Sequence, residues 1–106
     1  LESEKVVWSK KYFYGGKFDF LCEINGKIYL GDYKTGNSIY KEMQFQTAAY
    51  RLALEECEPE TKVDGSIIVN TTKDGKFNVE MFFDYEGAKD GFLACLKLYR
   101  LLNQEL

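Results

Sequence analysis

Apolar and polar residues alternate most clearly in two adjacent stretches, 17–24 and 27–34, which predicts a pair of β-strands. Asn25-Gly26 lies between them, and this dipeptide favours a two-residue type I′ turn, because both central residues need positive φ. Such a turn pairs Ile24 with Lys27 and, stepping outward, Asp19 with Asp32 and Lys17 with Lys34. The period of two then predicts two faces, an apolar one with Phe18, Phe20, Cys22 and Ile24, and a charged one with Lys17, Asp19, Asp32 and Lys34.

The rest of the chain predicts two helices and three more strands. The expected strands cover residues 6–9, 66–71 and 77–83, and the expected helices cover 39–57 and 85–103. Asn37 or Ser38 is the expected cap of the first helix, Pro59 ends it, and Asp84 is the expected cap of the second. The order β-β-β-α-β-β-α indicates an α+β fold built on a mixed sheet.

Helical spacing predicts which side chains of the two helices are buried. In the first helix, Gln46 and Tyr50 are four residues apart and project together from a buried side. The solvent-facing side is expected to carry Gln44, Thr47, Arg51 and Glu55. In the last helix, the expected buried stripe consists of Ala88, Phe92, Cys95, Leu96, Tyr99 and Leu102. Gly87 and Gly91 indicate close packing of that helix against another element.

Length and composition indicate one small domain over residues 1–106. The chain has 106 residues and 45% hydrophobic content, enough for a modest single core. It contains no long apolar run and no recognisable signal peptide, so we expect a cytoplasmic, intracellular protein that does not cross a membrane. Because the sequence opens with Leu rather than Met, we expect it to be a fragment of a larger protein with additional domains or subunits.

The residue types present restrict the possible chemistry. There is no histidine, which excludes Ser-His and Cys-His nucleophile pairs and histidine-ligated metals. Cys22, Cys57 and Cys95 are far apart and occupy apolar positions, so we expect buried free thiols rather than disulfides or a zinc site. Any catalysis must therefore depend on carboxylates, lysine and metal-bound water.

The two facing aspartates are the candidate chemical site. Like charges directly opposite each other destabilise a sheet unless something compensates them, and Mg²⁺ commonly binds one or two carboxylates. The alternative is the solvated end of a β-ribbon, whose aspartates pair with Lys17 and Lys34.

Three short motifs extend the metal interpretation. They are Gly16-Lys17-Phe18-Asp19, Asp32-Tyr33-Lys34-Thr35 and Gln46-Thr47-Ala48-Ala49-Tyr50. Their order resembles the G-x-x-D, D-x-K-T and Q-x-x-x-Y pattern of the PD-(D/E)xK nuclease superfamily, in its RecB-like exonuclease branch. The family also has an acidic residue on a helix before the first strand. No such helix is visible here, and Glu2 or Glu4 would be its remnant.

The resemblance implies a restriction-endonuclease-like α/β/α core and a metal-dependent deoxyribonuclease. Asp19, Asp32 and the Tyr33 carbonyl would bind Mg²⁺ or Mn²⁺, and Lys34 would act on the attacking water. Lys17, Thr35, Gln46 and Tyr50 would organise the site or contact the nucleic acid. The substrate would be a single- or double-stranded DNA end, in recombination, repair or phage DNA processing.

Charge is distributed in a way that suits this interpretation. The net charge is −3, but residues 5–51 carry eight basic against four acidic residues, and the facing aspartates lie within that segment. Two other interpretations remain open at this point. One is a nuclease-like module that binds nucleic acid or a protein without cutting, and the other is an unrelated α+β interaction domain.

Overall fold

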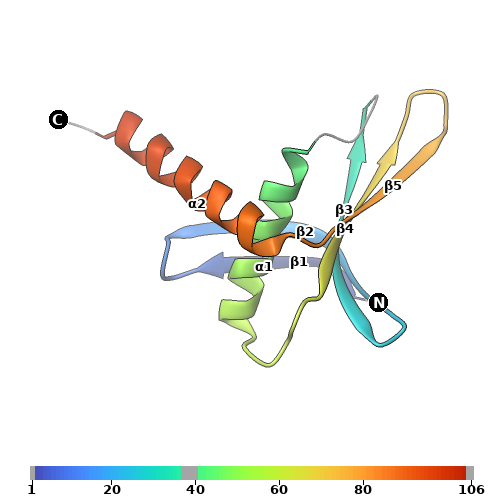
Figure 1. The fold of residues 1–106 in the computed structure, drawn as a ribbon, viewed down its shortest axis with the longest axis horizontal. Helices are drawn as coiled ribbons and strands as arrows, with labels where there is room; N and C mark the ends of the chain where they lie inside the picture. Colours follow the sequence, from blue (N-terminus) through green and yellow to red (C-terminus); the bar gives the residue numbers. More distant parts are fainter. Residues whose placement is uncertain (1, 37–40, 105–106) are drawn as a thin grey trace.

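A computed structural model describes residues 2–36 and 41–104 and shows a mixed five-stranded sheet with two helices (Figure 1). The elements in chain order are β1 (Glu2–Ser9), β2 (Tyr14–Ile24), β3 (Lys27–Thr35), α1 (Met43–Cys57), β4 (Gly65–Thr71), β5 (Phe77–Phe82) and α2 (Tyr85–Leu102). The predicted α+β class and the predicted element order are confirmed.

The strands lie side by side in sequence order, from β1 at one edge to β5 at the other. All neighbours are antiparallel except β3 and β4, which are parallel. A parallel pair needs a crossover connection, and α1 provides it between β3 and β4. This crossover places α1 over the strands that carry the candidate residues.

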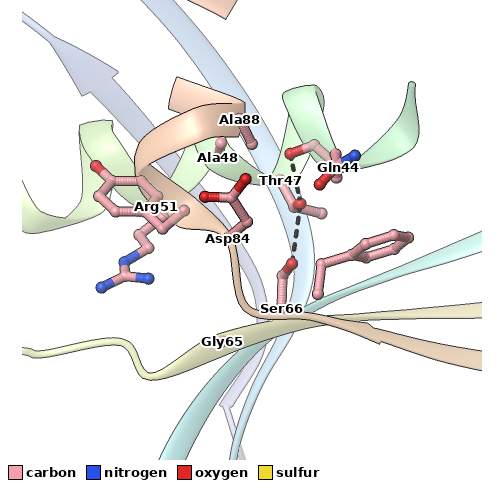
Figure 2. Close-up of a pocket in the computed structure, with 10 residues that line it drawn as sticks. Gln44, Thr47, Ala48, Arg51, Gly65, Ser66, Asp84 and Ala88 are labelled. Carbon is pink, nitrogen blue, oxygen red and sulfur yellow. Dashed lines mark hydrogen bonds between the residues drawn. The ribbon is translucent and has the colours of Figure 1, made fainter. Parts of the chain in front are cut away.

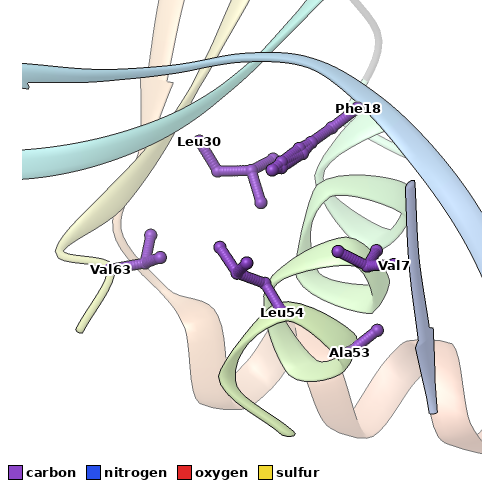
Figure 3. Packing of buried hydrophobic residues seen from close by; sticks show 6 residues of the cluster. All are labelled: Val7, Phe18, Leu30, Ala53, Leu54 and Val63. Carbon is purple, nitrogen blue, oxygen red and sulfur yellow. The ribbon is translucent and has the colours of Figure 1, made fainter. Parts of the chain in front are cut away.

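A buried cluster joins α1 to this face of the sheet (Figure 3). Its members, all at most 2% exposed, come from β1, β2, β3, α1 and the segment before β4: Val7, Phe18, Leu30, Ala53, Leu54 and Val63. Burying side chains of this size contributes about 1.5–3 kcal/mol for each of the larger ones. The cluster therefore holds α1 at a defined height above β2 and β3.

The opposite face of the sheet carries a second cluster, made of Phe20, Tyr29 and Ile67 with Cys22 and Val69 packed against it. All five residues belong to strands, so no described helix residue packs in this cluster. Of the α/β/α layers that the family resemblance implies, the described residues provide the sheet and one helical layer. The two clusters also correct one expectation. Phe18 and Phe20 were expected on the same face, but they lie on opposite faces of the sheet.

The bend of β2 explains that correction. Phe18 packs under α1, whereas the Phe20 ring covers Gly31 on the other side of the sheet, where an added Cβ would overlap it. In Figure 1, β2 curves from the β1 ribbon into the group formed by β3, β4 and β5. Alternation is regular only within a strand of uniform twist, so it fails where the strand bends. Ile24, at the turn, is 46% exposed.

The first helix is shorter than expected. It begins at Met43, four residues later than predicted, and its N-cap is Glu42, which makes no side-chain capping hydrogen bond. The predicted caps, Asn37 and Ser38, lie outside the described residues. The helix ends at Cys57, two residues before Pro59, as expected.

The second helix begins as predicted, but its outer half is not buried. Asp84 caps it by accepting a hydrogen bond from the Gly87 amide at 3.0 Å, and Gly91 lies against the Phe45 ring. Ala88 is buried, but Tyr99 and Leu102 are 64% and 75% exposed. The predicted stripe is wrong for this half, because the helix extends beyond the sheet and α1 (Figure 1).

The cysteines also differ from expectation. Cys95 is exposed, and Cys22 and Cys57 are only partly buried. All three are free thiols, as predicted. Within the described part of the chain, neither helix is long and apolar enough to cross a membrane.

Candidate active site

The hairpin between β2 and β3 has the predicted turn and register. Asn25 and Gly26 have φ values of 53° and 81°, as a type I′ turn requires. The ladder runs from the Ile24–Lys27 pair to the Phe20–Gly31 pair. Asp19 and Asp32 are the next positions outward in that register, on the side of the sheet that faces α1.

At this point, the Asp19 side chain bonds to the β3 backbone. The Tyr33 N–H donates to Asp19 Oδ2 at 2.7 Å. Asp19 lies one residue, and Tyr33 two residues, beyond the last pair of the β2–β3 ladder. The Asp19 carboxyl group also shares a hydrogen bond with the carboxyl group of Asp32. The bend of β2 thus brings two carboxyl groups together at the place where the two strands separate.

Asp32 is the buried member of this carboxyl pair. It is 4% exposed, and its Oδ2 lies 3.0 Å from Lys34 Nζ. Burial and the neighbouring Asp19 carboxylate raise its pKa to about 6, although the Lys34 ammonium acts in the other direction. The site therefore holds a carboxyl group whose negative charge is only partly compensated.

The pKa of Asp19 is shifted in the opposite direction. Burial raises its pKa, but the hydrogen bonds from the Asp32 carboxyl and the Tyr33 N–H and the charge of Lys34 outweigh this effect and lower the pKa overall. Two carboxyl groups in contact favour a state in which one proton is shared. The same contact raises the pKa of Asp32 and lowers that of Asp19.

The Gln46 and Tyr50 side chains of α1 complete the cluster. Lys34 Nζ donates a hydrogen bond to Gln46 Oε1, and the Tyr50 hydroxyl is hydrogen-bonded to the Gln46 side chain. Burial and the charges of Asp32 and Asp19 raise the pKa of Tyr50. The helix therefore places an amide and a phenol beside the carboxyl pair.

Gly16 allows Tyr50 to reach this position. A Cβ at Gly16 would overlap the Tyr50 ring, so the helix and the strand can approach only because residue 16 lacks a side chain. The first glycine of the G-x-x-D pattern thus has a packing role in this fold.

Other candidate residues lie outside the cluster. Lys17 forms an ion pair with Glu4 at 3.3 Å, and its charge also helps to lower the pKa of Asp19. The β2–β3 ladder ends at the Phe20–Gly31 pair, so the predicted pair of Lys17 with Lys34 is not part of it. Thr35 is exposed and follows Lys34 on the strand, which places it on the opposite face. The Tyr33 ring is 60% exposed and packs 5.0 Å from the Phe20 ring.

The donor set fits a hard divalent cation with few protein ligands. Mg²⁺ commonly binds one or two carboxylates and keeps several waters, which matches a partly compensated carboxyl pair. Among residues 2–36 and 41–104, no group of three acidic or cysteine side chains is placed to hold a metal. Glu4, the predicted remnant of a further acidic ligand, pairs with Lys17. The side chain of Glu2 is outside the described part of the structure.

Sequence patterns did not identify two polar residues near the site. Thr47 was expected in solvent, yet it is 1% exposed, and its hydroxyl bonds to the Gln44 carbonyl at 3.0 Å and to Ser66 Oγ at 3.1 Å (Figure 2). Asn70 of β4 is 0% exposed. Polar residues of this kind give no periodic signal, because their burial depends on which element packs above them.

A small cavity of about 20 Å³ lies beside Thr47, between α1, β4 and the start of α2. Figure 2 shows the residues that line it. Arg51 borders it, with its guanidinium 3.8 Å from the centre of the Tyr85 ring. The cavity has room for about one water molecule and does not include the carboxyl pair. It belongs to the junction that fixes α1, and the candidate site is the open cluster at the end of the β2–β3 ladder.

Comparisons with known proteins identify solved structures of similar fold. No protein-family model matches the chain, and no curated protein matches it. Several solved structures have a similar fold, among them two at 16% identity each. One, SSO0001, has a TM-score of 0.57, with 97% of this chain and 48% of that chain covered. The other, a Eubacterium rectale protein provisionally named an exonuclease, has a TM-score of 0.63, with 99% of this chain and 46% of that chain covered. This chain thus spans about half the length of each and shares its fold with them.

Proposed function

We propose that this chain is the core of a metal-dependent nuclease that hydrolyses phosphodiester bonds at DNA ends. The observation that carries the proposal is the convergence of two aspartates, a lysine, a glutamine and a tyrosine from β2, β3 and α1: Asp19, Asp32, Lys34, Gln46 and Tyr50. Their order along the chain matches the RecB-like motifs, and a protein of similar fold is provisionally named an exonuclease.

Asp19 and Asp32, with the Tyr33 carbonyl, would hold Mg²⁺ or Mn²⁺. A bound divalent ion would lower the pKa of water and stabilise negative charge on the phosphate oxygens. The carboxylates suit this role because they are already held together. The negative charge of Asp32 is only partly compensated in the absence of a bound cation.

Lys34 would stabilise charge in the transition state and orient the attacking water. Its ammonium is held between Asp32 Oδ2 and Gln46 Oε1, so its position is defined before a substrate binds. Gln46 and Tyr50 would position this group. A compact ammonium suits the role better than a planar guanidinium.

Substitutions at two positions test the proposal by separating metal binding from chemistry. Asp32→Ala removes a ligand, so we expect loss of both Mn²⁺ binding and cleavage. Lys34→Ala should retain Mn²⁺ binding, while cleavage falls by about 10²–10⁴-fold. Lys34→Arg should restore little of the rate. Calorimetric Mn²⁺ titration and single-turnover cleavage of labelled single- and double-stranded DNA measure the two effects.

Lys27→Ala is the matched control, because Lys27 is an exposed lysine at the hairpin turn of the same strand. It should cleave like the wild type. Wild-type cleavage by Lys34→Ala would contradict the proposed chemistry, and undiminished Mn²⁺ binding by Asp32→Ala would contradict the proposed metal site.

A second candidate function is a nuclease-like module that binds nucleic acid without cutting. The observation that favours it is the carboxyl pair, which has no third acidic partner among the described residues. This candidate predicts DNA binding by the wild type with no Mn²⁺-dependent cleavage, and equal DNA affinity for Lys34→Ala and Lys27→Ala.

A further inference from the structure

Asn70 of β4 carries a buried oxygen that lacks a hydrogen-bond partner among the described residues. The residue is 0% exposed, and its side-chain N–H donates to the Gly36 carbonyl at 3.3 Å. Its Oδ1 accepts no hydrogen bond from residues 2–36 or 41–104. Buried polar atoms are nearly always paired, so this exception requires an explanation from its surroundings.

The sheet register places Asn70 beside Lys34. The two residues are partners in the parallel β3–β4 ladder, and adjacent strands are about 4.8 Å apart. Ser66 lies four residues earlier on β4 and bonds to Thr47 of α1, so alternate residues from Ser66 to Asn70 face α1. Asp32 and Lys34 face the same way, because Asp32 is the partner of Ile68. Asn70 therefore borders the candidate site.

Lys34 has one more donor than the contacts described so far require. An ammonium has three N–H donors, and two of them are directed at Asp32 and Gln46. The contact with Asp32 is the weaker point of this arrangement, because any cation that binds the Asp32 carboxylate competes with the ammonium. A neutral acceptor beside Lys34 would hold the ammonium without that competition.

We propose that Asn70 is a positioning residue for Lys34, with Oδ1 as the acceptor that keeps the ammonium in the site when Asp32 is engaged elsewhere. The inference rests on the proposed function for its purpose, but the proposed hydrogen bond from Lys34 Nζ to Asn70 Oδ1 can be tested without metal or DNA. Asn70 Nδ2 meanwhile ties the end of β3 to β4 through Gly36, whose own N–H donates to the Thr71 carbonyl at 3.3 Å.

The test measures the acetylation rate of Lys34 in the whole chain, by mass spectrometry after brief treatment with acetic anhydride. An Asp32→Ala background imitates the engaged state, because Lys34 then lacks its carboxylate partner. Adding Asn70→Leu, which keeps the shape and removes the polar atoms, should raise the Lys34 rate at least about tenfold, as expected for loss of a hydrogen bond to a charged group.

Asn70→Asp distinguishes the acceptor role of Asn70 Oδ1 from the donor role of Asn70 Nδ2. It keeps the acceptor near Lys34 and removes the donor to Gly36, so in the same background it should leave the Lys34 rate at or below that of Asp32→Ala alone. Asn70→Ala replaces Asn70→Leu if circular dichroism shows that the leucine variant is unfolded. Asn78 is the register partner of Asn70 on β5 and is exposed, so Asn78→Leu is the matched control and should have no effect.

The proposal is overturned if Asn70→Leu and Asn70→Ala leave the Lys34 rate unchanged, or if Asn70→Asp raises it as much as Asn70→Leu does. An equal rise at Lys27, an exposed lysine far from Asn70 in the sheet, would indicate general loosening and would also overturn it. Since no metal is present, these outcomes are independent of the Mn²⁺ and cleavage measurements that test the nuclease itself.

Discussion

At the scale of single residues, Asp32 and Asp19 are chemically different although they occupy equivalent positions, each one residue beyond the β2–β3 ladder. Asp32 is almost fully buried and has a pKa raised to about 6, whereas the pKa of Asp19 is lowered. The difference arises because the Tyr33 N–H bonds to Asp19, and because burial is deeper at Asp32.

This asymmetry predicts that replacing the two aspartates changes the stability of the metal-free protein in opposite directions. Above about pH 6 the folded state must hold Asp32 charged at a cost, and this cost disappears as pH falls toward its unfolded value of 3.8. Asp32→Asn should therefore stabilise the fold at pH 7.5 by roughly 1–2 kcal/mol, because the benefit is partly offset by the lost Lys34 contact. This advantage should be largely gone at pH 4.5. Urea unfolding with a chelator at both pH values measures it.

Asp19→Asn provides the contrast. Its lowered pKa means that the charged form stabilises the fold above the unfolded pKa, so the substitution should lower stability at pH 7.5. If both variants are stabilised equally, or if the Asp32→Asn advantage is the same at both pH values, the assigned asymmetry is wrong.

At the scale of elements, the distance between β2 and α1 depends on Gly16. A Cβ there would overlap the Tyr50 ring, whereas a Cβ at Gly15 would only make an ordinary contact with the Val7 carbonyl oxygen at 3.5 Å. Alanine at Gly16 should therefore disturb the packing of α1, whereas alanine at the neighbouring Gly15 should not.

Gly16→Ala should displace the Tyr50 ring from the cluster and destabilise the chain by about 1–3 kcal/mol, the usual range for overpacking. We also expect DNA cleavage to fall in the folded fraction, because Tyr50 and Gln46 position Lys34. Gly15→Ala should change neither property by much. Thermal unfolding and single-turnover cleavage compare the variants, and equal effects at the two positions would contradict the packing role of Gly16.

At the scale of the whole molecule, one face of the sheet has no helix over it among the described residues. Beyond the buried residues of the second cluster, this face exposes Phe77 at 71% and Val79 at 62%, on the edge strand β5. Exposed apolar surface of this kind binds hydrophobic dyes even in a folded protein.

We therefore expect the folded wild type to bind an anilinonaphthalene dye. The double variant Phe77→Thr and Val79→Thr should bind clearly less, with a change in unfolding free energy within about 0.5 kcal/mol, since exposed side chains bury little area. Dye fluorescence and urea unfolding on the same samples measure both. A large loss of stability would show that these side chains are covered in solution.

Local features of the sequence were enough to predict much of this protein. The turn at Asn25-Gly26, the hairpin register as far as the Phe20–Gly31 pair, the element order and the cap at Asp84 all depend on short-range geometry, and each is confirmed. Asp19 and Asp32 come one residue beyond that ladder on their strands. Their roles in catalysis stay a prediction.

Only the tertiary structure decided the remaining features, because each depends on residues far apart in the chain. Phe18 and Phe20 separate onto two faces because β2 bends between its partners. Thr47 and Asn70 are buried by elements packed around them. The outer half of α2 stays largely exposed, although Arg100 donates a hydrogen bond to the Phe13 carbonyl. Periodicity predicts which residues share a side of an element. It does not predict what packs against that side, since packing is set by the path of the whole chain.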